Sequence, residues 1–120
     1  MSTQENNKGL TRIINAMFNT VAGFKATWKS EEAFRQEVWI CMIALPAGYW
    51  LGETGLERAL LVGSLLWVLT VELLNSGIEA VVDRVGMEHH ELSGRAKDMG
   101  SAAVFLSIAQ ACLVWFFILA

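Results

Sequence analysis

The chain has 120 residues, of which 54% are hydrophobic and 18% are charged, and its formal net charge is -3 at pH 7. This composition is too apolar for an ordinary soluble domain of that length and predicts an integral membrane protein. The small negative charge leaves no basic surface to neutralise a phosphate backbone, which argues against a nucleic-acid-binding protein.

Residues 10–28 have the periodicity of an amphipathic helix. Apolar side chains recur every three or four residues, which places them on one face of a helix with 3.6 residues per turn. Arg12 and Asn19 fall on the opposite face, and Lys25 lies near the border, where its long stem can reach lipid headgroups. The pattern predicts a helix that lies on the membrane surface. A helix packed on a soluble core is the alternative.

A second helix is predicted over residues 31–52. Ser30 is a suitable N-cap, and Glu31 lies in the first turn, where a carboxylate interacts favourably with the helix dipole. The uncharged stretch 38–52 is shorter than the roughly 20 residues needed to cross a bilayer. The first turns of this helix, which include Glu37, must therefore reach into the interface.

Two further spanning helices are predicted over residues 58–84 and 97–120. Between residues 59 and 82, Glu72 and Glu79 are the only charged residues, and the second of these helices carries no charge beyond its first turn. The charged and small residues between the two runs predict a loop. The expected fold class is an all-α membrane protein, with an N-terminal amphipathic surface helix and three transmembrane helices in a single membrane domain of residues 1–120.

Lysine and arginine are distributed unevenly among the segments that flank the apolar runs. The N-terminal region carries five of them, the first connection one and the second connection three. The positive-inside rule therefore places the N-terminus and the second connection in the cytoplasm. The unusual polar side chains then lie at similar depth near one membrane surface: Glu31, Glu37, Glu72, Glu79, Asp83, Lys97 and Asp98.

A polar stripe is predicted along the helix over 58–84, because Glu72, Asn75, Ser76, Glu79 and Asp83 recur at three-to-four-residue spacing. Carboxylates at this depth are costly, and the usual reason to retain them is a partner or a function. Glu72 and Glu79 are two turns apart, about 10 Å along the axis. That separation is too long for both to bind one small cation, but it suits one carboxylate for a metal and the other for a proton.

The residue types in this stripe fit magnesium and acid–base chemistry. Mg²⁺ prefers oxygen ligands and commonly takes one or two carboxylates together with phosphates and waters, so Glu79 and Glu31 form a candidate pair. Glu72 is the candidate general base for an alcohol, because an apolar environment disfavours the charged form of a carboxylate. Asn75 can orient either group. The alternative is that these polar residues only join helices.

Three cations in the second connection, Arg84, Arg95 and Lys97, can offer positive charge to a polyphosphate at the membrane surface. Their alternative role is to retain the topology. The neighbouring glycines do not form a GxxxxGK[ST] loop, so an ATP site here is predicted to differ from the P-loop. The adjacent His89 and His90 cannot share one helix face, and zinc is not indicated.

The segments EAFRQE (32–37), VELLNSGIEAVVDRVG (71–86) and HELSGRAKDMGSAAV (90–104) resemble the small prokaryotic diacylglycerol kinases of the inner membrane. The similarity extends from about Leu10 into the third spanning helix. The resemblance implies a homotrimer whose active sites lie at subunit interfaces near the cytoplasmic surface, with lipid entering from the membrane.

The resemblance also implies roles for particular residues. Glu72 would be the base that activates the lipid hydroxyl, and Glu31 and Glu79 would hold a divalent cation that bridges ATP, while Asn75 and Asp83 match positions tied to activity. The implied ATP contacts are Arg12, Asn19, Glu31, Glu79, Glu88, His90, Lys97 and Asp98. The implied lipid contacts are Arg12, Lys25, Trp28, Glu37, Glu72 and Ser101. Asn19, Ala22 and Lys25 depart from the residues common in the family at those positions of the surface helix.

The expected function is an ATP-dependent diacylglycerol kinase of the bacterial inner membrane, with Mg²⁺ as cofactor, ATP as co-substrate and phosphatidic acid as product. Undecaprenol kinase, a branch of the same family, is the alternative acceptor specificity. Diacylglycerol is preferred because the two longer segments are more similar to the Gram-negative branch. A non-catalytic oligomer, with the acidic stripe lining a pore, is the alternative from another class.

Overall fold

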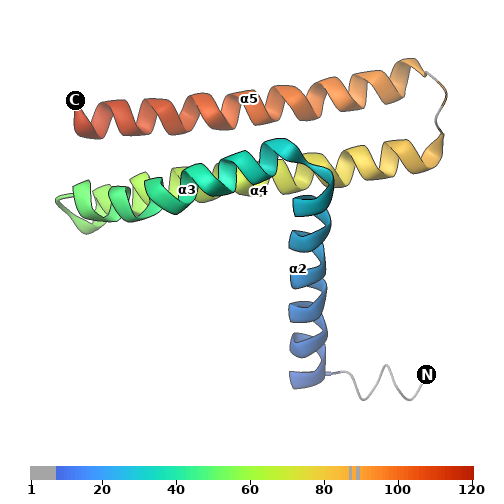
Figure 1. Ribbon diagram of the computed structural model, residues 1–120, viewed down its shortest axis with the longest axis horizontal. Helices are drawn as coiled ribbons and strands as arrows, with labels where there is room; N and C mark the ends of the chain where they lie inside the picture. The colour runs from blue at the N-terminus through green and yellow to red at the C-terminus, as the bar shows by residue number, and fades with distance from the viewer. Residues whose placement is uncertain (1–7, 87, 89) are drawn as a thin grey trace. The chain divides into compact units, whose positions relative to one another are not determined.

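In the computed structural model, which describes residues 8–86, 88 and 90–120, every regular element is an α-helix. The helices are α2 (Leu10–Ser30), α3 (Glu32–Leu51), α4 (Gly55–Val85) and α5 (Glu91–Leu119) (Figure 1). The chain divides into an N-terminal unit, residues 1–32, and a second unit, residues 33–120. Each unit is described by itself below.

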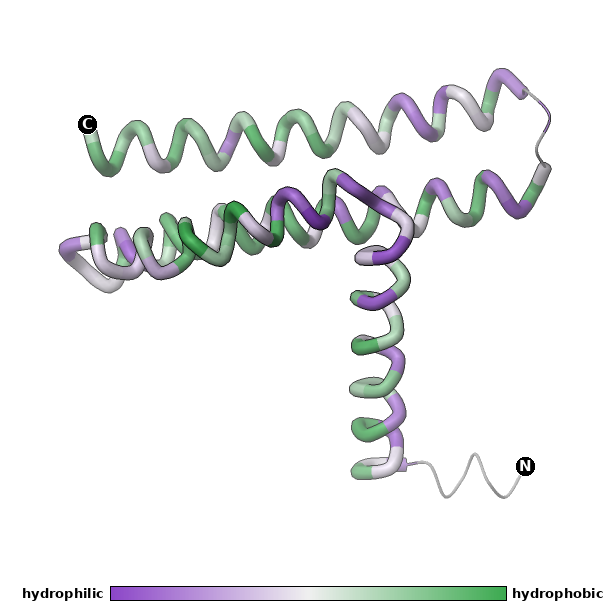
Figure 2. Tube along the Cα trace, viewed as in Figure 1, coloured by the Kyte–Doolittle hydropathy of each residue, from purple (hydrophilic) through white to green (hydrophobic). Residues whose placement is uncertain are grey.

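The amphipathic character of α2 is preserved in the structure, where green and purple segments alternate along it (Figure 2). Its apolar stripe is exposed, including Leu10, which is 72% exposed, and Phe18, which is 71% exposed. Ser30 was predicted to cap the next helix but is the last residue of α2. The backbone N–H of Glu31 donates to the carbonyl of Thr27, and this hydrogen bond keeps Ser30 within α2.

Helix α4 begins at Gly55 because Thr54 caps it. The Thr54 hydroxyl accepts a hydrogen bond from the backbone N–H of Glu57 at 3.1 Å, which satisfies one of the first unpaired amides of the helix. The helix continues for 31 residues and ends at Val85, before Gly86.

Helix α5 begins at Glu91, six residues before the start predicted from hydropathy. His90 caps it, since its Nδ1 accepts a hydrogen bond from the backbone N–H of Leu92 at 3.0 Å. The charged residues of 91–97 therefore form the first turns of a helix, whereas hydropathy alone marks them as a loop. Only a short connection between Val85 and Glu91 separates α4 from α5.

Helices α4 and α5 pack side by side in opposite directions (Figure 1). Near the start of α4, the Trp115 indole N–H donates to the Leu61 carbonyl at 3.1 Å and to the Ser64 hydroxyl at 3.2 Å. Near its other end, Asp83 pairs with Lys97. These contacts fix the register of α5 on α4 over most of their length.

Helix α3 packs against both helices at Gly48. A Cβ added at Gly48 would lie 3.2 Å from the Trp115 ring and 3.3 Å from the Leu61 Cβ, so the missing side chain permits the close approach. The turn into α4 is closed by Arg58, whose Nε donates to the Tyr49 carbonyl at 3.0 Å and whose guanidinium lies 5.1 Å from the centre of the Tyr49 ring.

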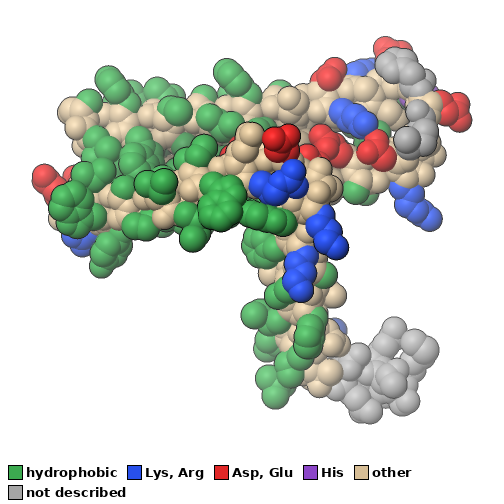
Figure 3. Space-filling view, in the orientation of Figure 1, with side chains coloured by type: hydrophobic (Ala, Val, Ile, Leu, Met, Phe, Trp, Pro, Cys, Tyr) green, Lys and Arg blue, Asp and Glu red, His purple; other side chains and the backbone are tan. Residues whose placement is uncertain are grey.

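Two helices in the described part of the chain, α4 and α5, are long and apolar enough to cross a membrane, with mean hydropathies of 1.7 and 2.3 over their most apolar stretches. Large apolar side chains on these helices are exposed, as Phe105 and Phe117 illustrate at 70% and 74%. On the face seen in Figure 3, hydrophobic side chains of the second unit lie mainly away from the α4–α5 connection, and most of its charged side chains lie on the half toward that connection. Across the described residues the fold is therefore all-helical, with α4 and α5 as candidate membrane-spanning helices.

Candidate active site

The predicted polar stripe occupies one side of α4 and becomes more exposed toward the α4–α5 connection. Glu72 is only 4% exposed, Asn75 and Glu79 are half-buried, and Asp83 is exposed. Within four helical turns, this side of α4 passes from a buried position to the exposed surface. This gradient allows a buried group to act on an apolar molecule while groups farther along bind a charged one.

The buried end of the stripe is a pair of carboxyl groups from two helices. The Glu37 carboxyl, on α3, hydrogen-bonds to the Glu72 carboxyl, on α4. Two carboxyls can form such a bond only when one of them carries a proton. Glu37 Oε2 is buried and has no hydrogen-bond partner among the described residues. The structure thus brings together the predicted base, Glu72, and a predicted lipid contact, Glu37.

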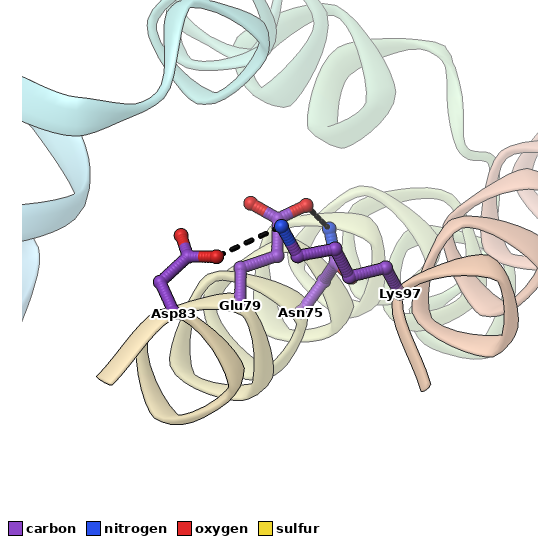
Figure 4. A network of polar contacts seen from close by, with 4 residues as sticks. All are labelled: Asn75, Glu79, Asp83 and Lys97. Atoms are coloured by element: carbon purple, nitrogen blue, oxygen red, sulfur yellow. Dashed lines mark hydrogen bonds and ion pairs between the residues drawn. The ribbon is translucent and has the colours of Figure 1, made fainter. Parts of the chain in front are cut away.

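The middle of the stripe is a network of four side chains from α4 and α5 (Figure 4). Asn75 Nδ2 donates to Glu79 Oε1 at a long 3.4 Å, which orients the Glu79 carboxylate. Lys97 Nζ pairs with Asp83 Oδ1 at 2.8 Å and is also attracted by the Glu79 charge. The Asp83–Lys97 pair was not predicted from the sequence. The sequence feature that could have indicated it is an acidic residue at the end of one helix followed by a basic residue in the first turns of the next.

The exposed end of the stripe opens into a cavity of about 260 Å³ at the α4–α5 connection. Its lining includes the predicted ATP contacts Glu88, His90 and Lys97, together with Asp83. Because His90 Nδ1 already accepts from Leu92, the side chain can offer its other ring nitrogen to a ligand. Sequence reasoning missed three small lining residues, Gly86, Ser93 and Gly94. His89 lies outside the described residues.

A second, larger cavity of about 400 Å³ lies among α3, α4 and α5 and is almost entirely apolar. Ile40, Val68, Ile108 and Ala111 line it, and Glu37 is the acidic residue in its wall. The carboxyl pair therefore stands beside an apolar groove, and such a groove is suited to a hydrocarbon chain.

The remaining predicted site residues are divided between the two units. Arg12, Asn19, Lys25 and Trp28 lie on α2, and Glu31 is its C-cap, so all five belong to the N-terminal unit. In the second unit, Asp98 and Ser101 are exposed on α5. The Glu31–Glu79 metal pair joins residues of different units and stays a prediction.

A divalent cation needs oxygen ligands, which carboxylates supply. Among the described residues, no group of three or more His, Cys, Asp or Glu side chains is placed to hold a metal. Mg²⁺ is commonly bound by one or two carboxylates and completed by substrate phosphates and waters. In the second unit, the Glu79 carboxylate accepts a hydrogen bond from Asn75, one helical turn before Asp83 in the wall of the polar cavity.

Comparison with known proteins agrees with this chemistry. The sequence profile of the family described as prokaryotic diacylglycerol kinase matches residues 18–119, which include the whole stripe and both cavities. The chain is 51% identical over 110 residues to the diacylglycerol kinase of Escherichia coli K12, covering 92% of this chain and 90% of the relative. It is 49% identical over 107 residues to that of Haemophilus influenzae, covering 89% and 91%, and 48% identical over 107 residues to that of Pseudomonas aeruginosa, covering 89% and 87%. The chain belongs to the prokaryotic diacylglycerol kinase family of lipid kinases.

Proposed function

We propose that this protein transfers the γ-phosphoryl group of ATP to the free hydroxyl of diacylglycerol, producing phosphatidic acid and ADP. The observation that carries the proposal is the Glu37–Glu72 carboxyl pair, in which Glu72 is buried and Glu37 half-buried. The pair stands next to an apolar groove and on the same side of α4 as a charged cavity. A lipid alcohol needs the groove, and a nucleotide needs the charged cavity.

On the acceptor side, the acyl chains occupy the apolar groove and the hydroxyl lies against the carboxyl pair. Glu72 accepts the hydroxyl proton while the alcohol oxygen forms a bond to the γ-phosphorus and the bond to the ADP oxygen breaks. Glu37 orients Glu72 and, together with Trp28, Lys25, Arg12 and Ser101, contacts the lipid. Burial keeps water, the competing acceptor, away from the reacting oxygen.

On the donor side, the polar cavity holds the polyphosphate. Lys97 supplies positive charge to its oxygens, Asp83 holds Lys97 in place, and Glu88 and His90 contact the nucleotide. Further nucleotide contacts come from Asp98 on α5 and from Arg12 and Asn19 on α2.

The metal ligands in this proposal are Glu79 and Glu31. A divalent cation at these carboxylates would neutralise charge on the phosphate oxygens of ATP. The role of Asn75 is to orient Glu79, which its hydrogen bond supports.

The membrane arrangement belongs to the same proposal. Helix α3 is the third span, α2 lies on the surface, and the active site faces the cytoplasm of the inner membrane, as the lysine and arginine distribution favours. Three chains form a homotrimer, which covers part of the exposed apolar surface of α4 and α5.

The proposal is tested by incubating the purified protein in mixed micelles with ATP and Mg²⁺, and with diacylglycerol, undecaprenol or no alcohol. We expect phosphatidic acid to form and undecaprenyl phosphate to be absent or minor. Phosphorylation of undecaprenol alone would show that the acceptor assignment is wrong. Phosphorylation of neither alcohol would contradict the kinase proposal.

The role of Glu72 is tested by Glu72→Gln, which keeps the shape of the side chain but cannot accept the proton. We expect kcat to fall by about 100-fold or more, the usual contribution of a general base, with unchanged helical content and oligomer size. Glu53→Gln, in the exposed turn before α4, is the matched control and should retain activity. Normal turnover of Glu72→Gln would remove Glu72 from the base role.

A further inference from the structure

We propose that Gly100 is a positioning residue: its missing side chain is what allows Asn75 to hold the Glu79 carboxylate. The inference starts from a single close approach between α5 and α4. A Cβ built on Gly100 would overlap Asn75 Oδ1, so an L-residue with a side chain cannot occupy this position while Asn75 keeps its conformation. Gly100 is buried and Asn75 is half-buried, so the contact lies between the two helices and not on their outer surface.

The orientation of the Asn75 amide explains why the contact matters for Glu79. A carboxylate only accepts hydrogen bonds, so the Asn75 nitrogen must face Glu79 and the oxygen must face the opposite way, toward Gly100. Asn75 Oδ1 is buried and has no hydrogen-bond partner in the described part of the chain. Its neighbour is therefore a glycine C–H, which is a weak donor and, above all, a small one.

A side chain at position 100 would act on Glu79 through Asn75. To avoid the overlap, the Asn75 amide would have to rotate away from α5. Its hydrogen bond to Glu79 is already long at 3.4 Å, so even a small rotation would break it. Glu79 would then lose the group that fixes its orientation, although Gly100 itself does not contact Glu79.

Backbone conformation gives no competing reason for glycine here. Gly100 lies inside α5, and among the described residues the only glycine with a positive φ is Gly9. Alanine has a higher helix propensity than glycine, so Gly100→Ala should favour the helix itself. A harmful effect of this substitution must therefore come from its contact with Asn75.

The experiment compares Gly100→Ala, Asn75→Ala and the double variant with the wild-type protein, and it rests on the proposed role of Glu79 in holding the cation. Mn²⁺ binding is measured by electron paramagnetic resonance in the presence of a non-hydrolysable ATP analogue, and phosphatidic acid formation is measured separately. Gly77→Ala is the matched control, because it makes the same substitution on α4 at a site where a Cβ meets no atom within 4 Å.

We expect Gly100→Ala and Asn75→Ala each to weaken Mn²⁺ binding by about tenfold or more, the usual effect of removing a partner of a metal ligand. The double variant should be no weaker than either single variant, since both changes remove the same hydrogen bond. The KM for diacylglycerol should change little. The double variant also removes the overlap, so it keeps the test valid if Gly100→Ala alone folds poorly.

Two results would overturn the inference: normal Mn²⁺ binding by Gly100→Ala, or multiplied losses in the double variant. If the single and double variants lose Mn²⁺ binding equally but the wild-type protein phosphorylates no diacylglycerol, the role of Gly100 is supported and the lipid substrate is rejected. If the wild-type protein forms phosphatidic acid and Gly100→Ala binds Mn²⁺ normally, the inference is rejected and the proposed function is unaffected.

Discussion

The hydrogen bond between Glu37 and Glu72 predicts that two substitutions of Glu37 will have very different effects. Glu37→Gln keeps a donor at the same place, because the amide can donate to the Glu72 carboxylate. Glu37→Ala removes the bond and leaves Glu72, which is 4% exposed, without this partner. A hydrogen bond to a charged group contributes about 1.5–3 kcal/mol, so the loss corresponds to roughly a 10- to 100-fold change in rate.

The assay is the steady-state formation of phosphatidic acid in mixed micelles, with kcat and the KM for diacylglycerol measured separately. We expect Glu37→Ala to reduce kcat within that range and Glu37→Gln to reduce it by less than about tenfold. Glu32→Gln, in the exposed first turn of α3, serves as the control and should be close to wild type. Equal losses in the alanine and glutamine variants would refute the reasoning, because the hydrogen bond to Glu72 would then not be the cause.

Two further predictions follow from contacts elsewhere in the second unit. Lys97→Met should raise the KM for ATP by about tenfold or more, as expected for a lost charge-assisted contact. Asp83→Asn should have a smaller effect, because it leaves the Lys97 charge in place. Unchanged ATP kinetics in Lys97→Met would remove Lys97 from the nucleotide site. The melting temperatures of both variants should stay near wild type, since the side chains of the pair are 45% and 55% exposed. Trp115→Phe should lower the free energy of unfolding by about 1–2 kcal/mol, measured by titration with SDS, because it removes one bifurcated hydrogen bond and part of the contact with Gly48. The activity of Trp115→Phe should persist, because its partner Leu61 lies roughly 20 Å along α4 from Asn75. Trp50→Phe is the control, because the Trp50 side chain is 81% exposed. Equal stability of the two variants would contradict the prediction.

Much of the secondary structure was predictable because apolar periodicity is a local property. The amphipathic pattern of α2, the long apolar runs of α4 and α5 and the three-to-four spacing of Glu72, Asn75 and Glu79 each depend only on residues close together in the chain. Family membership was likewise predictable from the segments 71–86 and 90–104 and is confirmed by the comparisons.

Helix ends were less predictable, because a cap depends on side-chain geometry that hydropathy does not measure. His90 begins α5 well before the apolar run, and Ser30 ends α2 although its residue type favours a start. In both cases a single hydrogen bond near the boundary, to His90 Nδ1 or to the Thr27 carbonyl, decides where the helix ends.

The sequence by itself determined that this protein is helical and apolar, that acidic residues share one face of α4, and which family it belongs to. Only the tertiary structure decided which side chains from different helices meet: Glu37 with Glu72, Lys97 with Asp83, and Gly100 with Asn75. The physical reason is that periodicity fixes the face of a helix on which a residue lies, whereas the register between two helices depends on how their side chains pack. The Gly100–Asn75 contact arises from that register.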